Sequence, residues 1–234
     1  MVPQVLGGRG VRMIRSACLD QLVTAIGAVR RDHPTRVAID GVDGVGKTTL
    51  ADELVEPLAR TGRQILRASI DGFHQPRAFR YRRGPDSAEG YFLDSFDYAA
   101  LKSSLLDPLG PHGARRFRSA MFNHRTDLPV VLPWQTAAVE AVLLFDGVFL
   151  QRPELSGSWD FRIWVEAPFD VTAPRAVRRD AGGHDEAEVD TKYRRRYVPG
   201  QMMYLAQCSP REAADVVVQN VEFDNPDLQF RRVD

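Results

Sequence analysis

The sequence contains almost no lysine and has no net charge. Of its 31 basic residues, 28 are arginines and only Lys47, Lys102 and Lys192 are lysines. Aspartate and glutamate also total 31, so the formal net charge is zero. A nucleic-acid-binding domain usually carries a basic excess or a basic stripe. We therefore do not expect a nucleic acid as the partner of this chain.

Cysteines and long apolar runs are equally scarce. The two cysteines, Cys18 and Cys208, lie far apart and lack metal-ligand spacing, which argues against a disulfide scaffold or a zinc site. No run of about 18 apolar residues is present, so we expect no membrane span. Residues 1–10 are glycine-rich and lack the apolar core of a secretory signal. The expectation is a cytoplasmic protein with a disordered start at residues 1–10.

Apolar runs of strand length alternate with helical patterns along the chain. Buried strands are expected at 36–40, 64–69, 141–146, 161–166 and 215–219. Helices are expected at 12–32, 48–60, 96–106, 171–180 and 193–206, with irregular stretches at 71–92 and 107–133 and a mobile connection at 181–190. This alternation predicts one α/β domain over residues 1–234, a three-layer doubly wound fold with about five parallel strands.

The strongest motif lies between the first predicted strand and the helix after it. Residues 41–48 read GVDGVGKT and match G-x-x-x-x-G-K-[ST] without deviation. Glycines let successive backbone N–H groups turn inward around an anion, and the helix N-terminus adds partial positive charge. We call residues 41–48 the phosphate cradle. The expected nucleotide-binding residues are Gly41, Val42, Asp43, Gly44, Val45, Gly46, Lys47, Thr48 and Thr49.

Two aspartates follow predicted strands. Asp71, in the segment IDGFH, could accept a proton as a general base, because a carboxylate after a strand lies at the ligand edge of such a sheet. Asp146 ends the apolar run VLLFD and is a candidate magnesium ligand together with the hydroxyl of Thr48. Each aspartate precedes a glycine, so an ordinary turn is the alternative interpretation.

Three arginines cluster in the predicted helix at 171–180. Arg175 and Arg179 share a helix face, and Arg178 lies beside them. Such a set could clamp a triphosphate from a lid, and Arg179 could neutralise charge in the transition state. The alternative is a solvated, arginine-rich surface of a helix.

Taken together, these segments resemble the uridine kinase and phosphoribulokinase-like branch of P-loop kinases. The matching segments are GVDGVGKTT (41–49), IDGFH (70–74), LFDGV (144–148), RAVRRD (175–180) and ADVVV (214–218). The resemblance implies the P-loop kinase fold with a small lid, placed at 175–200, and ATP and Mg²⁺ as cofactors. It also implies a catalytic set of Asp71, Lys47 and Arg179, and transfer of phosphate to a hydroxyl of a small molecule, with a uridine- or cytidine-like nucleoside as the best guess.

The resemblance places the acceptor-binding region at residues 74–125. The candidate contacts there are His74, Arg83, Tyr91, Phe92 and His124. The sequence departs from uridine kinases at two matched positions, because His74 stands for a tyrosine and Asp146 for the usual glutamate. Four arginines within 77–83 also leave open an acidic or already phosphorylated acceptor.

Other classes of function remain alternatives. Pantothenate kinase shares a D-G-F element, so a pantothenate- or sugar-phosphate-type kinase of the same fold stays open. Thymidylate kinases have a similar cradle, but their D-R-Y element is absent here. The chain also lacks the N-K-x-D element of GTP-binding switches, and an intact Lys47, Thr48 and Asp71 argue against a non-catalytic nucleotide-binding regulator. The expected partner is a small-molecule acceptor, and a homo-oligomer is left open.

Overall fold

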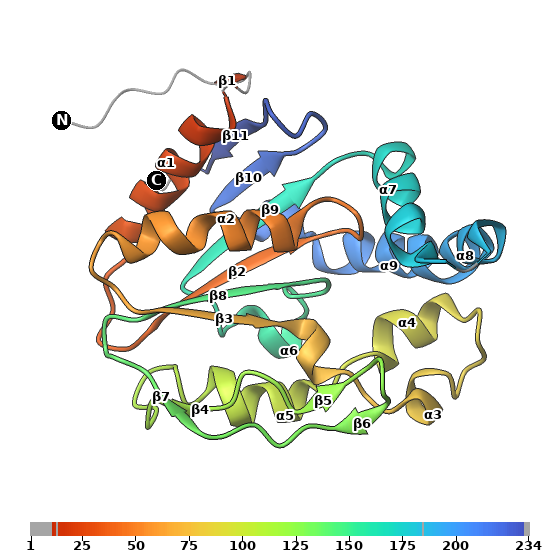
Figure 1. The fold of residues 1–234 in the computed structure, drawn as a ribbon, viewed down its shortest axis with the longest axis horizontal. Coiled ribbons are helices and arrows are strands. Elements are labelled where there is room, and N and C mark those ends of the chain that lie inside the picture. Colours follow the sequence, from red (N-terminus) through yellow and green to blue (C-terminus); the bar gives the residue numbers. More distant parts are fainter. Residues whose placement is uncertain (1–10, 13, 184, 232–234) are drawn as a thin grey trace.

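The centre of the protein is a seven-stranded sheet, seen in a computed structural model that describes residues 11–12, 14–183 and 185–231. The strand order is β1-β11-β10-β9-β2-β8-β3 (Figure 1). Five neighbouring strands are parallel and lie where the sequence predicts them: β2 (Thr35–Gly41), β3 (Ile65–Ser69), β8 (Val142–Gly147), β9 (Phe161–Glu166) and β10 (Val216–Gln219). The predicted doubly wound α/β fold is confirmed, whereas the expected disorder of 1–10 lies outside the described residues.

Two further strands extend the sheet beyond β10, and the sequence pattern does not predict them. β11 (Asp227–Phe230) pairs antiparallel with β10, and the short β1 (Val11–Arg12) pairs antiparallel with β11. Strands of two to four residues at a sheet edge carry too little alternation to register as a periodic signal.

The central strand β2 lies where the sheet winding reverses. β8 flanks it on one side and β9 on the other, both parallel to it. All seven residues of β2 and all six of β8 are buried, as expected for strands covered on both faces. Ligands of open α/β sheets bind outside the carboxyl ends of the strands at such a reversal. The phosphate cradle follows β2 directly and therefore occupies that point.

Helices cover both faces of the sheet. α1 (Arg15–Ala28) and α2 (Lys47–Ala59) contact each other in front of it, and α9 (Val198–Cys208) lies behind it (Figure 1). α2 buries Leu50, Leu54 and Leu58, which recur every four residues and form one apolar stripe. The short helices α6 (Pro153–Ser156) and α10 (Pro210–Ala213) complete the connections between strands.

The segment between β3 and β8 is more ordered than its composition suggests. It contains η1 (Ile70–Phe73), α3 (Arg77–Arg80), α4 (Ala88–Asp94), α5 (Tyr98–Leu101), η2 (Lys102–Leu106), β4 (Arg116–Phe117), β5 (Phe122–Asn123), β6 (Leu128–Pro129) and β7 (Gln135–Thr136). Side-chain caps start two of these helices, because Ser87 accepts from Gly90 N and Asp97 accepts from Ala100 N. The stretches read as irregular therefore hold helices and ribbons too short for periodicity to reveal.

The segment after β9 forms helices that project beside the sheet (Figure 1). α7 (Phe169–Ala181) is followed by α8 (Glu186–Lys192), the turn η3 (Tyr193–Tyr197) and α9. The mobile connection expected at 181–190 therefore includes most of α8. Asp185 caps this helix by accepting from Ala187 N at 2.9 Å, and no residue of α8 is buried. A helix of seven residues whose main apolar contact comes from Val189 gives no apolar period to recognise.

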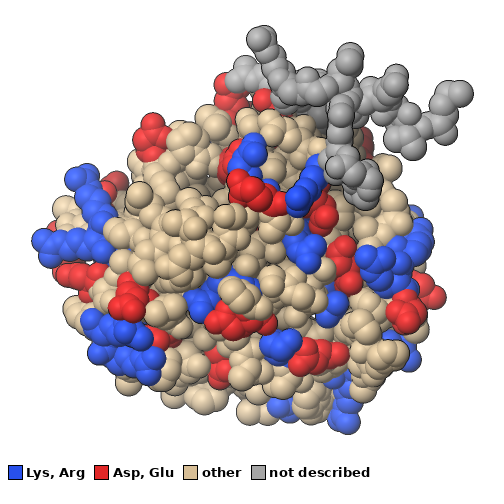
Figure 2. All heavy atoms as spheres, turned by 180° about the vertical axis from the view of Figure 1, so that it is seen from behind, with Lys and Arg blue, Asp and Glu red and all other residues tan. Residues whose placement is uncertain are grey.

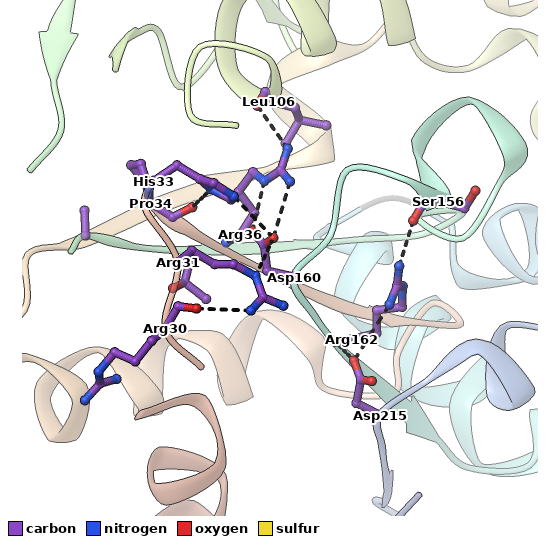
Figure 3. Close-up of polar contacts among 12 residues, drawn as sticks. Arg30, Arg31, His33, Pro34, Arg36, Leu106, Ser156, Asp160, Arg162 and Asp215 are labelled. Atoms are coloured by element: carbon purple, nitrogen blue, oxygen red, sulfur yellow. Dashed lines mark hydrogen bonds and ion pairs between the residues drawn. The ribbon is translucent and has the colours of Figure 1, made fainter. Parts of the chain in front are cut away.

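At the amino end of the sheet, ion pairs tie neighbouring strands together (Figure 3). Asp160, just before β9, accepts from both the backbone N and the Nε of Arg36 in β2, at 2.8 and 3.0 Å. Arg31 Nε and His33 Nε2 lie 3.5 and 3.8 Å from the same carboxylate. These contacts stand at the strand ends opposite to the cradle.

Candidate active site

The cradle is formed by backbone geometry that demands glycine. Gly44 has φ of 74°, and a Cβ built on it would lie 2.3 Å from the carbonyl oxygen of Thr172 in α7. No larger residue fits there without moving α7. α7 therefore rests directly on the cradle, and α2 begins at the end of the cradle with Lys47.

Lys47 is buried inside the cradle. Its Nζ donates to the carbonyl oxygen of Val42 at 2.7 Å. Burial lowers the pKa of Lys47, and the carboxylates of Asp43 and Asp40 act against this by favouring its charged form. The predicted phosphate-binding lysine thus points back into its own loop, where a bound phosphate would offer a stronger acceptor.

Thr48 and Asp146 are in direct contact. The Thr48 hydroxyl donates to Asp146 Oδ2 at 2.7 Å, and Arg67 Nη1 of β3 lies 3.1 Å from the other carboxylate oxygen. A hydroxyl and a carboxylate are hard oxygen ligands of the kind Mg²⁺ takes, usually with several waters and phosphate oxygens. The pair fits a magnesium ion. The described residues contain no cluster of three or more His, Cys, Asp or Glu suited to a metal.

The register of β3 against β8 places Asp71 at the same edge of the sheet as the Thr48–Asp146 pair. Ser69 of β3 is the register partner of Asp146 in β8, and Ile39 of β2 is its partner on the other side. Asp71 stands two residues beyond Ser69, in η1, and donates its backbone N to Ser69 Oγ at 3.3 Å. Its side chain is 62% exposed. Three adjacent strand ends thus carry the cradle, the magnesium pair and the candidate base.

His74 and His124 lie together beside Asp71. The His74 ring is 4.8 Å from that of His124 and 4.6 Å from that of Phe96, between centroids. His74 Nδ1 is 3.1 Å from the carbonyl oxygen of Asp71 and 4.0 Å from its carboxylate. Burial lowers the pKa of His74 to about 4, against the attraction of Asp71, so the ring is neutral at pH 7.

Only some of the other candidate acceptor residues face the cradle. Tyr91, although buried, donates its hydroxyl to Asp43 at 2.9 Å. Phe92 packs in the core, with its ring 5.3 Å from that of Phe149. Arg83 donates its Nε to Asp94 at 2.8 Å, so its guanidinium is already engaged.

The three arginines of α7 differ in their partners. Arg175 donates to the carbonyl oxygens of Asn220 and Val221, at 3.2 and 2.8 Å, beside the end of β10. Arg179 pairs with its neighbour Asp180 at 2.7 Å, and its charge reaches Lys47. Arg178 is exposed in the last turn of α7. Arg175 and Arg179 therefore have different partners within the protein, and Arg178 lies at the surface.

Several contact residues escape the sequence patterns. Gln201 of α9 is buried and bonds Asp43 twice, from Nε2 to Oδ2 and from Asp43 N to Oε1, each at 2.9 Å. Tyr204, one turn later, donates to the buried Asp40 at the end of β2. Burial raises the pKa of Asp40 to about 7, although the hydrogen bond from Tyr204 opposes the shift. Two polar residues three apart on one face of a mostly apolar helix are the signal that could have found them.

A separate cavity of about 560 Å³ lies behind the cradle. Val42 is the one cradle residue in its wall, and the apolar residues Trp164, Phe169, Leu205 and Pro210 are among those that line it. The candidate catalytic residues do not line it. On the face of the molecule seen from behind, acidic and basic side chains are interleaved (Figure 2).

The sheet order, the cradle and the neighbouring strand-end acids define a P-loop kinase. The sequence matches the model of the Phosphoribulokinase / Uridine kinase family over residues 37–225, and the chain belongs to that family. No sequence among curated proteins matches the chain. The predicted family is thereby confirmed, together with its coarser implications of nucleotide binding and a small-molecule substrate.

Solved structures of similar fold include three kinases. A possible uridine kinase from Bacillus stearothermophilus has a TM-score of 0.69 and 24% identity, covering 86% of this chain and 97% of that one. A phosphoribulokinase from Rhodobacter spheroides has a TM-score of 0.58 and 17% identity, and the match covers 87% of this chain and 82% of that one. A D-glycerate 3-kinase from Cryptococcus neoformans has a TM-score of 0.57 and 10% identity, and the match covers 92% of this chain and 97% of that one. At these identities the likeness shows the fold. Within the described part of the chain, every helix is too short or too polar to span a bilayer.

Proposed function

We propose that this chain is an ATP- and magnesium-dependent phosphotransferase that phosphorylates a hydroxyl of a small molecule, with a uridine- or cytidine-like nucleoside as the best candidate. The observation that carries the proposal is the shared edge of β2, β8 and β3, which holds the cradle, the Thr48–Asp146 pair and Asp71. The family and the likeness to a possible uridine kinase support the nucleoside.

Each residue has a defined task in this proposal. Backbone N–H groups of the cradle bind the phosphates, and Lys47 leaves the Val42 carbonyl to contact the terminal phosphate groups. Thr48 and Asp146 would hold a magnesium ion, which supplies charge neutralisation when bound. Arg179 would release Asp180 and turn toward the developing negative charge. Arg175 and Arg178 are proposed to contact the nucleotide from α7.

Asp71 acts as the general base. It takes the proton of the acceptor hydroxyl, whose oxygen bonds to the γ-phosphorus while the bond from that phosphorus to the β–γ bridging oxygen breaks. ADP leaves with the electron pair of that bond. The exposed carboxylate of Asp71 is accessible to a hydroxyl, and His74 beside it is neutral and does not neutralise it by pairing.

An acceptor panel tests the proposal. Coupled ADP-release assays with Mg-ATP and uridine, cytidine, pantothenate, D-glycerate or ribulose 5-phosphate should show stimulation by at least one acceptor. Lys47→Ala should abolish transfer, because the cradle loses its one buried cation. Arg60→Ala, which removes an exposed cation at the far end of α2, should retain it. Failure of Mg-ATP to bind, or full activity of Lys47→Ala, would contradict the proposal.

A further inference from the structure

The cradle carries a carboxylate, and that carboxylate is built into the site. Asp43 lies half-buried within the loop that binds phosphate. Its Oδ2 accepts from Tyr91 of α4 and from Gln201 of α9, both at 2.9 Å, and both donors are themselves buried. A residue of the cradle is thus tied to the helix of the acceptor region and to the helix behind the sheet.

α4 lies close enough to reach the cradle because α9 has a glycine, Gly200, where the two helices touch. A Cβ built on Gly200 would lie 2.8 Å from Tyr91 Cδ1 and 2.9 Å from the carbonyl oxygen of Ala88, so only glycine permits this approach. Gly200 is the neighbour of Gln201 in sequence. The two donors to Asp43 therefore come from one tight helix–helix contact.

The second carboxylate oxygen of Asp43 differs from the first in its hydrogen bonding. Among the hydrogen bonds formed by the described residues, none is accepted by Oδ1 of Asp43. The Asp43 carboxylate is the leading charge that stabilises protonated Lys47, and it also acts on Arg179. Its charge therefore acts on both Lys47 and Arg179, the two cations assigned to the transfer step. A carboxylate at this point repels a second anion and accepts from a hydroxyl.

The arginines of the acceptor region offer little to an anionic acceptor. Arg82 and Arg83 both bind the buried Asp94, at 2.6 and 2.8 Å. Arg80 binds Asp127 and the carbonyl oxygen of Gln75, at 3.2 and 2.7 Å. Arg77 is exposed, with its guanidinium 6.0 Å from the ring of Tyr81. Three of the four arginines that suggested an acidic substrate are thus already bound to carboxylates or carbonyl oxygens of the protein.

Resting on the proposed kinase function, we infer that Oδ1 of Asp43 accepts a hydrogen bond from a second hydroxyl of the acceptor, and that the acceptor is an uncharged polyhydroxylated molecule. A sugar or a nucleoside meets this requirement, whereas a phosphorylated or carboxylated acceptor brings a negative charge against Asp43. Asp43 contributes to the choice of acceptor as well as to the shape of the cradle.

Steady-state kinetics with Asp43→Asn test the inference. Asn keeps the size of the side chain and removes its charge, so KM for the best neutral acceptor should rise by about 10-fold or more. KM for Mg-ATP should change several-fold less. The wild type should use uridine, cytidine or D-ribose in preference to pantothenate, D-glycerate or ribulose 5-phosphate, and Asp43→Asn should narrow that preference. Glu56→Gln, which removes an exposed negative charge from α2, should change neither KM.

The outcomes separate this inference from the proposed function. Transfer by the wild type mainly to an anionic acceptor would overturn the inference and leave the kinase intact. Equal increases of both KM values in Asp43→Asn would also overturn it, because Asp43 would then only shape the cradle. Transfer to no acceptor, despite binding of Mg-ATP, would remove the proposed function and the inference with it.

Discussion

At the scale of single residues, the carboxylates near the cradle differ in environment and therefore in role. Asp71 is 62% exposed, Asp146 is bound by Thr48 and Arg67, and Asp40 is fully buried. An incoming hydroxyl can reach Asp71, Asp146 already has two partners, and burial raises the pKa of Asp40 to about 7.

Asp71→Asn should reduce turnover by about 10² or more, because the amide cannot take the proton of the acceptor hydroxyl. Binding of Mg-ATP should change little, since the cradle does not include Asp71. Coupled kinetics give the turnover, and calorimetric titration with Mg-ATP gives the binding constant. Undiminished turnover would remove Asp71 as the base.

Asp40 should make stability fall as the pH rises from about 4 to 7. An unfolded aspartate loses its proton near pH 4, whereas the folded protein holds this one until about pH 7. The folded state therefore binds more protons in that window, and the free energy of unfolding decreases as they are released. Asp40→Asn should flatten the dependence of Tm on pH between 5 and 7.

The exposed Asp107→Asn, which loses only a surface pair with Lys102, is the matched control and should keep the wild-type slope. An Asp40→Asn variant with the wild-type slope would show that Asp40 does not carry the proton.

At the scale of elements, the turn between α8 and α9 is attached to the acceptor region by one buried arginine. Arg196 of η3 donates to the carbonyl oxygens of Arg80 and Ser87, at 2.9 and 3.0 Å, and also reaches that of Gly84. Lys192 adds a hydrogen bond to the Tyr81 hydroxyl at 3.0 Å. The segment from Lys192 to Arg196 and the loop between α3 and α4 therefore pack as one unit.

Arg196→Lys should loosen that unit. A lysine has no planar fork with which to reach several carbonyls at once, so buried acceptors are left unpaired at a cost of about 1–3 kcal/mol. Hydrogen exchange of the amides at 80–87 should accelerate about 10-fold, and Tm should fall. Arg194→Lys, which alters only an exposed pair with Asp190, should leave both unchanged. Unaltered exchange in Arg196→Lys would contradict this account of the contact.

At the scale of the whole molecule, the parallel sheet and the cradle follow from sequence because their signals are local. Val142 to Phe145 is an unbroken apolar run, and the cradle motif fits between one such strand and a helix. α8 gives no such signal because it is short and has few apolar residues, and α3 and α4 are shorter than two turns, whereas the helix predicted at 96–106 is present as α5 and η2. A periodic pattern can be recognised only in an element that is long enough to repeat it.

The candidate site was predictable only in part, for the same reason. The cradle, Asp71 and Asp146 stand at recognisable strand ends. The partners of the cradle do not, because Gln201 and Tyr204 lie more than 150 positions from the residues they contact. No periodic pattern in one chain encodes a pairing at that separation. Arg67 was missed as well, since a lone arginine in an apolar strand reads as an interruption.

The ion pairs around Asp160 stabilise the sheet at the end opposite to the cradle. Asp160 and Arg36 fasten β9 to β2 at the end remote from the cradle. The long segment between β3 and β8, which holds the acceptor candidates, can then diverge without loosening the contact between β2 and β9. Descendants of one ancestral scaffold could in this way exchange what they phosphorylate and inherit the phosphate-handling machinery unaltered.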